Sequence, residues 1–321
     1  MKFLLRVSIL ILFISSVKQV SAQETLPIFS DYLSDNVYLL HPAAAGIGTC
    51  GKVRLTAGRY WEDNELQTLS FHSKLGEDTN ASAGVVLFND KNGYHSQKGI
   101  QGTFAYHLDL FRGGEFNQLS FGLSLGAVQN TVDQTTFTGD PTVAQLIESD
   151  FYFNGDFGVA YHYGGLSSYF TVKNLFLSAK GNLNDRYEPL NLRNYIFGAG
   201  YFFGNEEKFQ YEPSVMLQFK EGTSENYLDV NMKVYKKLDK AQLWAALSYR
   251  RSFDGNPVQE VQQITPILGA NVGQWMFSYT YSKQSGSVVF ENAGFHQLTV
   301  GVNVLCRRPR ASACPNINGS F

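Results

Sequence analysis

The sequence predicts an all-β fold: a transmembrane antiparallel β-barrel of about fourteen strands with a short N-terminal pre-barrel segment. Three observations predict it. Segments of about ten residues or more alternate between apolar and polar side chains, which is the length that a tilted membrane strand needs. Small residues are frequent on the polar side of these segments, as in 119–126, and suit a crowded interior. The N-terminus has the pattern of a secretory signal.

The first 22 residues are expected to be a signal peptide. Lys2 and Arg6 flank the start of an apolar stretch, and small side chains lead up to a cleavage point after Ala22. The alternative is an uncleaved anchor. A cleaved signal places the mature chain outside the cytoplasm.

The mature chain is expected to have three parts. Residues 23–50 are too apolar for a free tail, and we expect them to pack into the periplasmic mouth or the lumen, with a short helix near 29–39. The transmembrane barrel is expected over 51–305. A periplasmic C-terminal tail is expected over 306–321, and its basic residues either contact a periplasmic partner or are solvated.

The alternating segments follow one another with short and long connections in turn. Strands are expected at 51–60, 66–74, 82–90, 99–109, 117–129, 151–162, 168–178, 192–203, 208–220, 226–238, 241–252, 261–270, 274–283 and 294–305. The longer connections are expected to face outward and the short ones the periplasm, as in outer-membrane barrels. An even strand count then leaves both termini in the periplasm.

The hairpin around Asp239-Lys240 fixes one register. If these two residues form the loop, Val230 faces Tyr249 on a wholly apolar face. On the other face, which is polar, Asp229 meets Arg250 as a matched charge pair. The opposite register would mix the two faces. We therefore expect the apolar face to meet lipid and the polar face to line the interior.

Composition narrows the alternatives. The formal net charge of −2 gives no basic field for nucleic acid. The slightly negative mean hydropathy does not exclude a barrel, because the lipid-facing side chains occupy only every second position. Stacked β-sandwiches or a propeller are the soluble alternative, but the strands are long and no blade-length repeat is present.

The sequence does not favour an enzyme. The histidines are scattered, and no metal-protease, CxxC or phosphate-loop motif is present. Ser70 and His72 share a strand face, as chance would often arrange. We expect no catalytic residue, no cofactor, no bound metal and no small-molecule substrate.

The segment 27–48 contains two short motifs, a Phe-Ser-x-Tyr stretch and a Pro-Ala-x-Ala-Gly turn. Their residues are Phe29, Ser30, Tyr32, Pro42, Ala43, Ala45 and Gly46. Together they resemble the opening of the PorP/SprF family of Bacteroidota outer-membrane proteins. His41 stands where that family usually has Asn, and Ala44 where it usually has Tyr. Further matches lie at 165–175, 211–222, 243–250 and 294–315, so the resemblance spans most of the mature chain.

The resemblance implies a role beside the type IX secretion system and the gliding motility machinery. Barrels of this family look like cell-surface anchoring partners. They receive the C-terminal domain of a secreted adhesin, or they tie the apparatus to periplasmic envelope proteins. A passive or selective porin is the alternative function, and an outer-membrane enzyme is the third.

Two sets of residues follow from the register and from barrel closure. Asp229 and Arg250 are expected to pair within a polar lumen network, the alternative being two separately hydrated charges. Other lumen-facing candidates are Lys52, Arg54, Glu212, Lys220 and Lys233. Cys50 precedes the first strand and Cys306 follows the last, so a disulfide of Cys50 with Cys306 or Cys314 would staple the closing seam. The alternative is free thiols.

Overall fold

The computed structural model describes residues 32–307 except 60–63, 77–78, 93–94, 111–115, 134, 136–146, 177–178, 182–186, 190–191, 222–225, 254–260 and 287–293. The expected signal peptide, Phe29, Ser30 and Cys314 lie outside the described residues.

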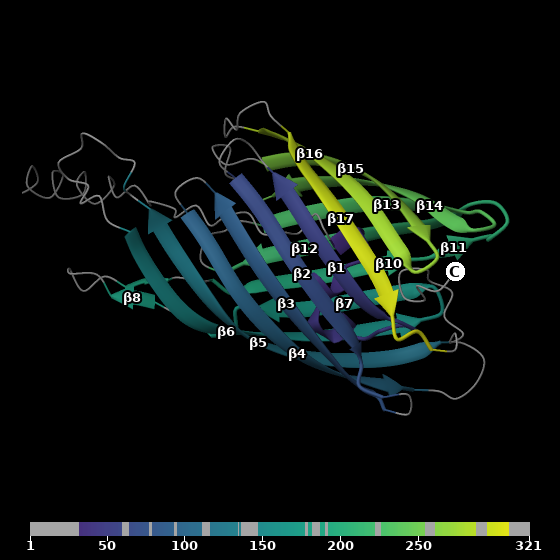
Figure 1. Ribbon diagram of the computed structural model, residues 1–321, viewed down its shortest axis with the longest axis horizontal. Helices are drawn as coiled ribbons and strands as arrows, with labels where there is room; N and C mark the ends of the chain where they lie inside the picture. Colours follow the sequence, from purple (N-terminus) through teal and green to yellow (C-terminus); the bar gives the residue numbers. More distant parts are fainter. Residues whose placement is uncertain are drawn as a thin grey trace, which may run out of the picture.

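Fourteen long antiparallel strands form one closed barrel (Figure 1). They are β1 (Gly51–Arg59), β2 (Asn64–Lys74), β3 (Ala81–Asn92), β4 (His95–Asp109), β5 (Asn117–Asp133), β6 (Ile147–Tyr163), β7 (Leu166–Lys173), β10 (Asn194–Tyr201), β12 (Gln210–Lys220), β13 (Asn226–Lys237), β14 (Ala241–Ser252), β15 (Val261–Val272), β16 (Trp275–Gly286) and β17 (Phe295–Val304). Successive strands pair with each other, and β1 pairs with β17 to close the ring. Closure leaves no unpaired sheet edge in lipid. The predicted fold class is confirmed.

The two faces of the wall differ as the alternation predicts. Along β14, intermediate or exposed positions alternate with buried ones over the whole strand. Large apolar side chains point outward, such as Leu268 with 64% and Leu247 with 54% of its surface exposed. Polar side chains such as Thr265 and Ser248 point inward and are buried. This arrangement is the reverse of a soluble protein and is typical of a barrel in a membrane.

The hairpin register is the one that the turn predicts. In β13 and β14, Val230 lies opposite Tyr249 and Asp229 lies opposite Arg250. The Leu238 amide donates to the Ala241 carbonyl at 2.7 Å across the Asp239-Lys240 loop. We name this end of the barrel the short-turn end. The opposite end, where 134–146 joins β5 to β6, is the long-loop end.

Several strands are longer than the sequence predicts. β4 begins at His95, β5 ends at Asp133 and β6 begins at Ile147. β5 and β6 pair along their whole length. The apolar–polar alternation stops before these ends, because the side chains there no longer alternate between lipid and lumen. The backbone ladder continues without it. Strand boundaries read from alternation therefore mark the apolar band rather than the whole strand.

Two short features were not predicted. The connection expected to be a loop at 179–191 contains a small hairpin of β8 (Ala179–Gly181) and β9 (Tyr187–Pro189). β11 (Phe203–Gly204) continues β10 along β12 after a break at Phe202. Phe202 is buried in the lumen core. Tyr201 and Phe203 on either side are exposed, so Phe202 keeps the inward and outward alternation of the wall across the break, and its amide donates to the Gly165 carbonyl at 2.8 Å.

Residues 32–50 lie inside the barrel, and we call them the plug (Figure 1, purple). The plug contains the 3-10 helices η2 (Val37–Leu39) and η3 (Pro42–Ala44), where a short helix near 29–39 was expected. Among the described residues, none of the helices is long and apolar enough to cross a membrane.

The plug forms an apolar core with one side of the wall. Leu33, Ala44 and Ile47 of the plug pack with wall side chains. The buried wall members are Phe202, Tyr235, Trp244, Ala246, Ile267 and Met276. The expected polar lining of the interior is interrupted here, because the plug gives the inward aromatic and aliphatic side chains an apolar partner.

Candidate functional site in the barrel lumen

A buried ion pair fixes the plug to the wall. Lys233 Nζ lies 2.9 Å from Asp35 Oδ1, and both side chains are less than one-tenth exposed. The same ammonium donates to the Leu33 carbonyl at 3.1 Å and lies 4.0 Å from the centre of the Trp244 ring. These contacts satisfy the buried charge of Lys233 from the plug on one side and the wall on the other.

The electrostatic environment keeps Asp35 ionised. Burial raises the pKa of the Asp35 carboxyl. The nearby positive charges of Lys233, Lys52 and Arg54 together lower this pKa by a larger amount. The pKa therefore lies below its usual value. Asp35 was not among the sequence candidates. A carboxylate in an apolar segment is nevertheless a signal of a buried counter-charge.

A second contact joins the plug to the predicted charge pair. Arg250 donates from Nε and Nη2 to the two carboxylate oxygens of Asp229, each at 2.7 Å. Tyr32 of the plug lies against this pair, with its hydroxyl donating to Asp229 Oδ2 at 3.4 Å. The same hydroxyl accepts from Asn231 Nδ2 at 2.8 Å. The family-motif tyrosine thus contacts the lumen pair directly.

The other lumen candidates are distributed among several contacts. Arg54 donates from Nη2 to Asn303 Oδ1 at 2.9 Å, beside the closing seam. Glu212 accepts a hydrogen bond from the Tyr235 hydroxyl. Lys52 and Lys220 are buried in the lumen wall, both less than one-tenth exposed. Of these five candidates, Lys233 is the one described above in an ion pair with Asp35 of the plug.

The motif turn of the plug fits a wall of small residues. A Cβ on Gly122 of β5 would lie 2.3 Å from the Ala43 amide nitrogen and from the Pro42 carbonyl carbon. Gly46 adopts φ of +70°, and a Cβ there would lie 2.3 Å from Ser82 Oγ. The His107 ring contacts the Ala45 carbonyl at 3.0 Å. The small motif residues therefore pack against small wall residues, and neither side has space for a larger one.

His41 is held neutral by its surroundings. Its ring stacks on Tyr169 with centres 4.7 Å apart, and Nδ1 lies 2.8 Å from Thr171 Oγ1. Burial, with a smaller effect of the Lys173 ammonium, lowers the pKa of His41 from 6.5 to about 3. The docked plug therefore takes up a proton on His41 only at a much lower pH than the free chain.

Replacing His41 with asparagine is expected to remove part of the pH dependence of stability. Between pH 6.5 and about 3 the unfolded chain binds a proton that the docked plug excludes, so stability falls as the pH falls. The loss due to His41 is expected to reach about 1.4 kcal/mol per pH unit. Urea unfolding in detergent at several pH values measures it. The exposed His296→Asn is the control, and parallel pH curves for His41→Asn and the unaltered protein would contradict the expectation.

Cys50 and Cys306 form a disulfide across the closing seam. Cys50 ends the plug, and Cys306 follows β17, whose Val304 pairs with Gly51 of β1. The Arg307 amide donates to the Thr49 carbonyl at 2.9 Å beside the disulfide. The bond therefore ties the base of the plug to the last strand.

Replacing Cys50 with serine is expected to destabilise the barrel by about 2–4 kcal/mol, because the disulfide restricts the unfolded chain. Cys306→Ser is expected to give the same loss. Guanidinium unfolding under oxidising conditions measures both, and reductant should lower the unaltered protein to the same level. The control is Cys314→Ser, which is expected to change nothing. An equal loss in that variant would contradict the assignment.

Ser70 and His72 are engaged by the plug. The Asn36 side-chain amide donates to Ser70 Oγ at 3.1 Å, and the Gly46 amide donates to His72 Nδ1 at 2.8 Å. Their lumen positions thus hold plug contacts. In the described ranges, no group of three or more His, Cys, Asp or Glu side chains is arranged to hold a metal ion.

A closed antiparallel barrel with an apolar exterior and a polar, plugged lumen defines a transmembrane β-barrel of the outer-membrane class. The family of the type IX secretion system membrane protein PorP/SprF matches residues 21–302, and this chain belongs to that family. The resemblance seen in the N-terminal motifs is confirmed. No curated protein sequence matches the chain significantly.

Solved structures of other barrels are similar to this one in architecture. The CymD monoaromatic hydrocarbon channel has 11% identity and a TM-score of 0.49, with 88% of this chain and 94% of that chain covered. A FadL homologue of Pseudomonas aeruginosa has 9% identity and a TM-score of 0.48, with 82% and 92% covered. The toluene transporter TodX of Pseudomonas putida has 11% identity and a TM-score of 0.47, with 84% and 92% covered.

Proposed function

We propose that this barrel is a non-enzymatic anchor that holds or recruits a protein partner of the type IX secretion and gliding machinery. The partner is the C-terminal domain of a secreted adhesin or a periplasmic envelope-linking protein. The observation that carries the proposal is the plug. The plug occupies the bore, where a porin needs open water. It is held there by its contacts with Lys233 and Asp229 and by the Cys50–Cys306 disulfide.

The proposed orientation places the short-turn end in the periplasm. The short connections 164–165, 238–240 and 273–274 lie at this end. Outer-membrane barrels have their shorter turns on the periplasmic side and their longer loops outside. The base of the plug and Cys306 then face the periplasm, and a periplasmic partner has access to them.

In-cell crosslinking tests the proposal at both ends of the barrel. A photo-crosslinking residue replaces the exposed Lys240 in a short turn, or the exposed Lys91 at the long-loop end of β3. A specific product with a periplasmic envelope protein from position 240 supports envelope linkage. A product with the C-terminal domain of a secreted protein from position 91 supports adhesin anchoring. No specific product from either position, with the barrel present in the outer membrane, would contradict an anchoring role.

A further inference from the structure

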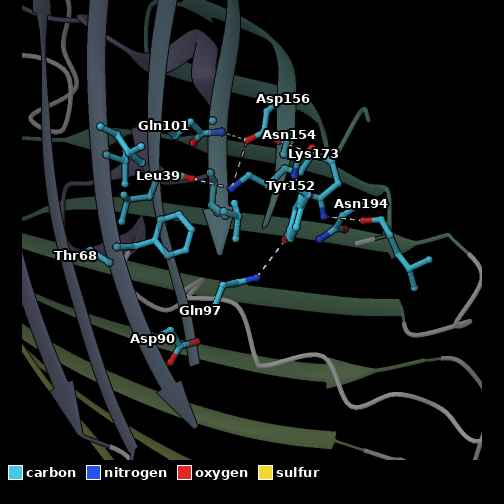
Figure 2. Close-up of a pocket in the computed structure, with 18 residues that line it drawn as sticks. Leu39, Thr68, Asp90, Gln97, Gln101, Tyr152, Asn154, Asp156, Lys173 and Asn194 are labelled. Atoms are coloured by element: carbon cyan, nitrogen blue, oxygen red, sulfur yellow. Dashed lines mark hydrogen bonds and ion pairs between the residues drawn. The ribbon is translucent and has the colours of Figure 1, made fainter. Parts of the chain in front are cut away.

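A cavity remains between the plug and the long-loop end of the lumen (Figure 2). It has a volume of about 180 Å³, and Leu39 and Leu40 of the plug line it on the plug side. Strands β2 to β7 and β10 form its walls. Cavities of roughly 150 Å³ can hold a molecule of the size of benzene, so the space admits a small organic ligand.

One wall of the cavity has a buried carboxylate without a counter-charge. Asp90 is 5% exposed, and no cation pairs with it in the part of the chain that the structure describes. On the opposite wall the Asp156 carboxylate is satisfied, because Gln101 Nε2 donates to it at 2.7 Å and Lys173 lies 3.9 Å away. The uncompensated negative charge of this cavity therefore belongs to Asp90.

Two further polar groups of the cavity lining can accept a hydrogen bond from a ligand. Thr68 Oγ1 and Asn194 Oδ1 line the cavity and are buried without a hydrogen-bond partner among the described residues. Gln97 of β4 lies opposite Asp90 of β3 in the strand ladder. Its side-chain amide, however, donates to Asn130 Oδ1 at 2.9 Å. The cavity thus presents the Asn194 acceptor and the Thr68 hydroxyl, which can accept or donate, and a ligand donor would satisfy both, as buried polar groups usually are.

The remaining lining is apolar. Phe88, Val86 and Val128 come from the wall, and Leu39 and Leu40 from the plug. Such surfaces bind hydrocarbon, while a few polar groups fix the orientation of a ligand. The charge, the open acceptors and the apolar lining together specify a donor-bearing cation with a short apolar body.

We propose that this cavity binds a small organic cation, with a primary ammonium or guanidinium group at Asp90 and a short aliphatic or aromatic body against Phe88. This ligand goes beyond the proposed anchoring function and does not depend on it. The same chemistry is carried by a free amine and by a lysine or arginine side chain of a peptide. The sequence did not lead us to expect a small-molecule ligand.

Binding of phenylethylammonium to the full-length protein in detergent tests the proposal, measured by isothermal titration calorimetry. Asp90→Asn is expected to weaken binding by at least about tenfold, because it removes a charge-assisted hydrogen bond. Neutral phenylethanol is expected to bind the unaltered protein at least about tenfold more weakly, for the same reason. Glu65→Gln is the matched control. Glu65 of β2 lies at the same end of the barrel as Asp90 of β3, but it is exposed and does not line the cavity.

Two measurements keep the result interpretable. Asp90→Asn is expected to fold, because it removes a buried charge without a partner, and circular dichroism checks this. Thr68→Val, a second variant, is expected to weaken binding by about threefold. Equal binding in Asp90→Asn and the unaltered protein, or no saturable binding of the cation, would overturn the proposal.

Competition identifies the source of the cation. Nα-acetyl-lysine amide carries the same ammonium group on a peptide-like backbone. Displacement of phenylethylammonium by this compound at a lower concentration than by butylammonium supports a peptide side chain. The reverse order supports a free amine.

Discussion

Replacing Lys233 with methionine is expected to loosen the plug and to open a conducting path through the barrel. The change leaves the Asp35 carboxylate buried without its ion-pair partner at 2.9 Å. Breaking a buried pair on one side costs about 3–5 kcal/mol, and we expect the lower value because Lys52 and Arg54 still attract Asp35. A loss of about 3 kcal/mol raises the undocked fraction roughly a hundredfold. Hydrogen exchange of the plug amides and conductance in planar bilayers measure the two effects.

Two variants control this expectation. Asp35→Asn combined with Lys233→Met removes both members of the ion pair and is expected to restore part of the protection of the plug, because Lys52 and Arg54 then lose the attraction of Asp35. Lys237→Met removes the same charge from an exposed pair with Glu206 and is expected to change nothing measurable. Plug amides that stay as protected in Lys233→Met as in the unaltered protein would show that the ion pair does not hold the plug.

Replacing Arg250 with methionine is expected to destabilise the barrel itself by about 3–5 kcal/mol. Asp229 is 1% exposed and receives two hydrogen bonds from the guanidinium. Without Arg250, the contact left to the Asp229 carboxylate among the described residues is the longer one with Tyr32, at 3.4 Å. Guanidinium unfolding in detergent, followed by circular dichroism, measures the loss.

The double variant Asp229→Asn with Arg250→Met separates charge from packing. It removes both buried charges, and we expect it to recover at least about half of the lost stability, because an uncharged lumen position has no large desolvation cost. If the double variant is as unstable as Arg250→Met, the loss comes from packing of the arginine side chain rather than from the unpaired carboxylate.

The buried pairs are better understood as positioning devices than as sources of net stability. Desolvation offsets much of the attraction between two buried charges, so a pair adds little compared with a well-packed apolar contact. An incorrectly docked plug, however, would leave Asp35 and Lys233 unpaired at a large cost. The pairs therefore favour one docked arrangement of the plug over others.

Local sequence patterns predict the wall well. The Asp239-Lys240 turn and the alternation around it determine the register that places Asp229 opposite Arg250. This works because turn geometry and the period of two are local properties. Closure likewise makes the first and last strands neighbours, which brings Cys50 to Cys306.

The contacts of the plug could not be predicted in the same way. Asp35 meets Lys233 across 198 positions of sequence, and this contact depends on how the whole segment sits in the bore. Tyr235 and Trp244 point inward among polar neighbours, and the docked plug provides the apolar surroundings in which they are buried. The surroundings of Asp90 in the cavity are built from seven strands and the plug together.

Planar-bilayer conductance of the unaltered, oxidised protein tests the central claim most directly. A bore occupied by a plug that is fixed through Lys233, Asp229 and the disulfide predicts no large, steady open channel. A large and stable conductance in the unaltered protein, with the Cys50–Cys306 bond intact, would contradict a plugged anchor and support the porin.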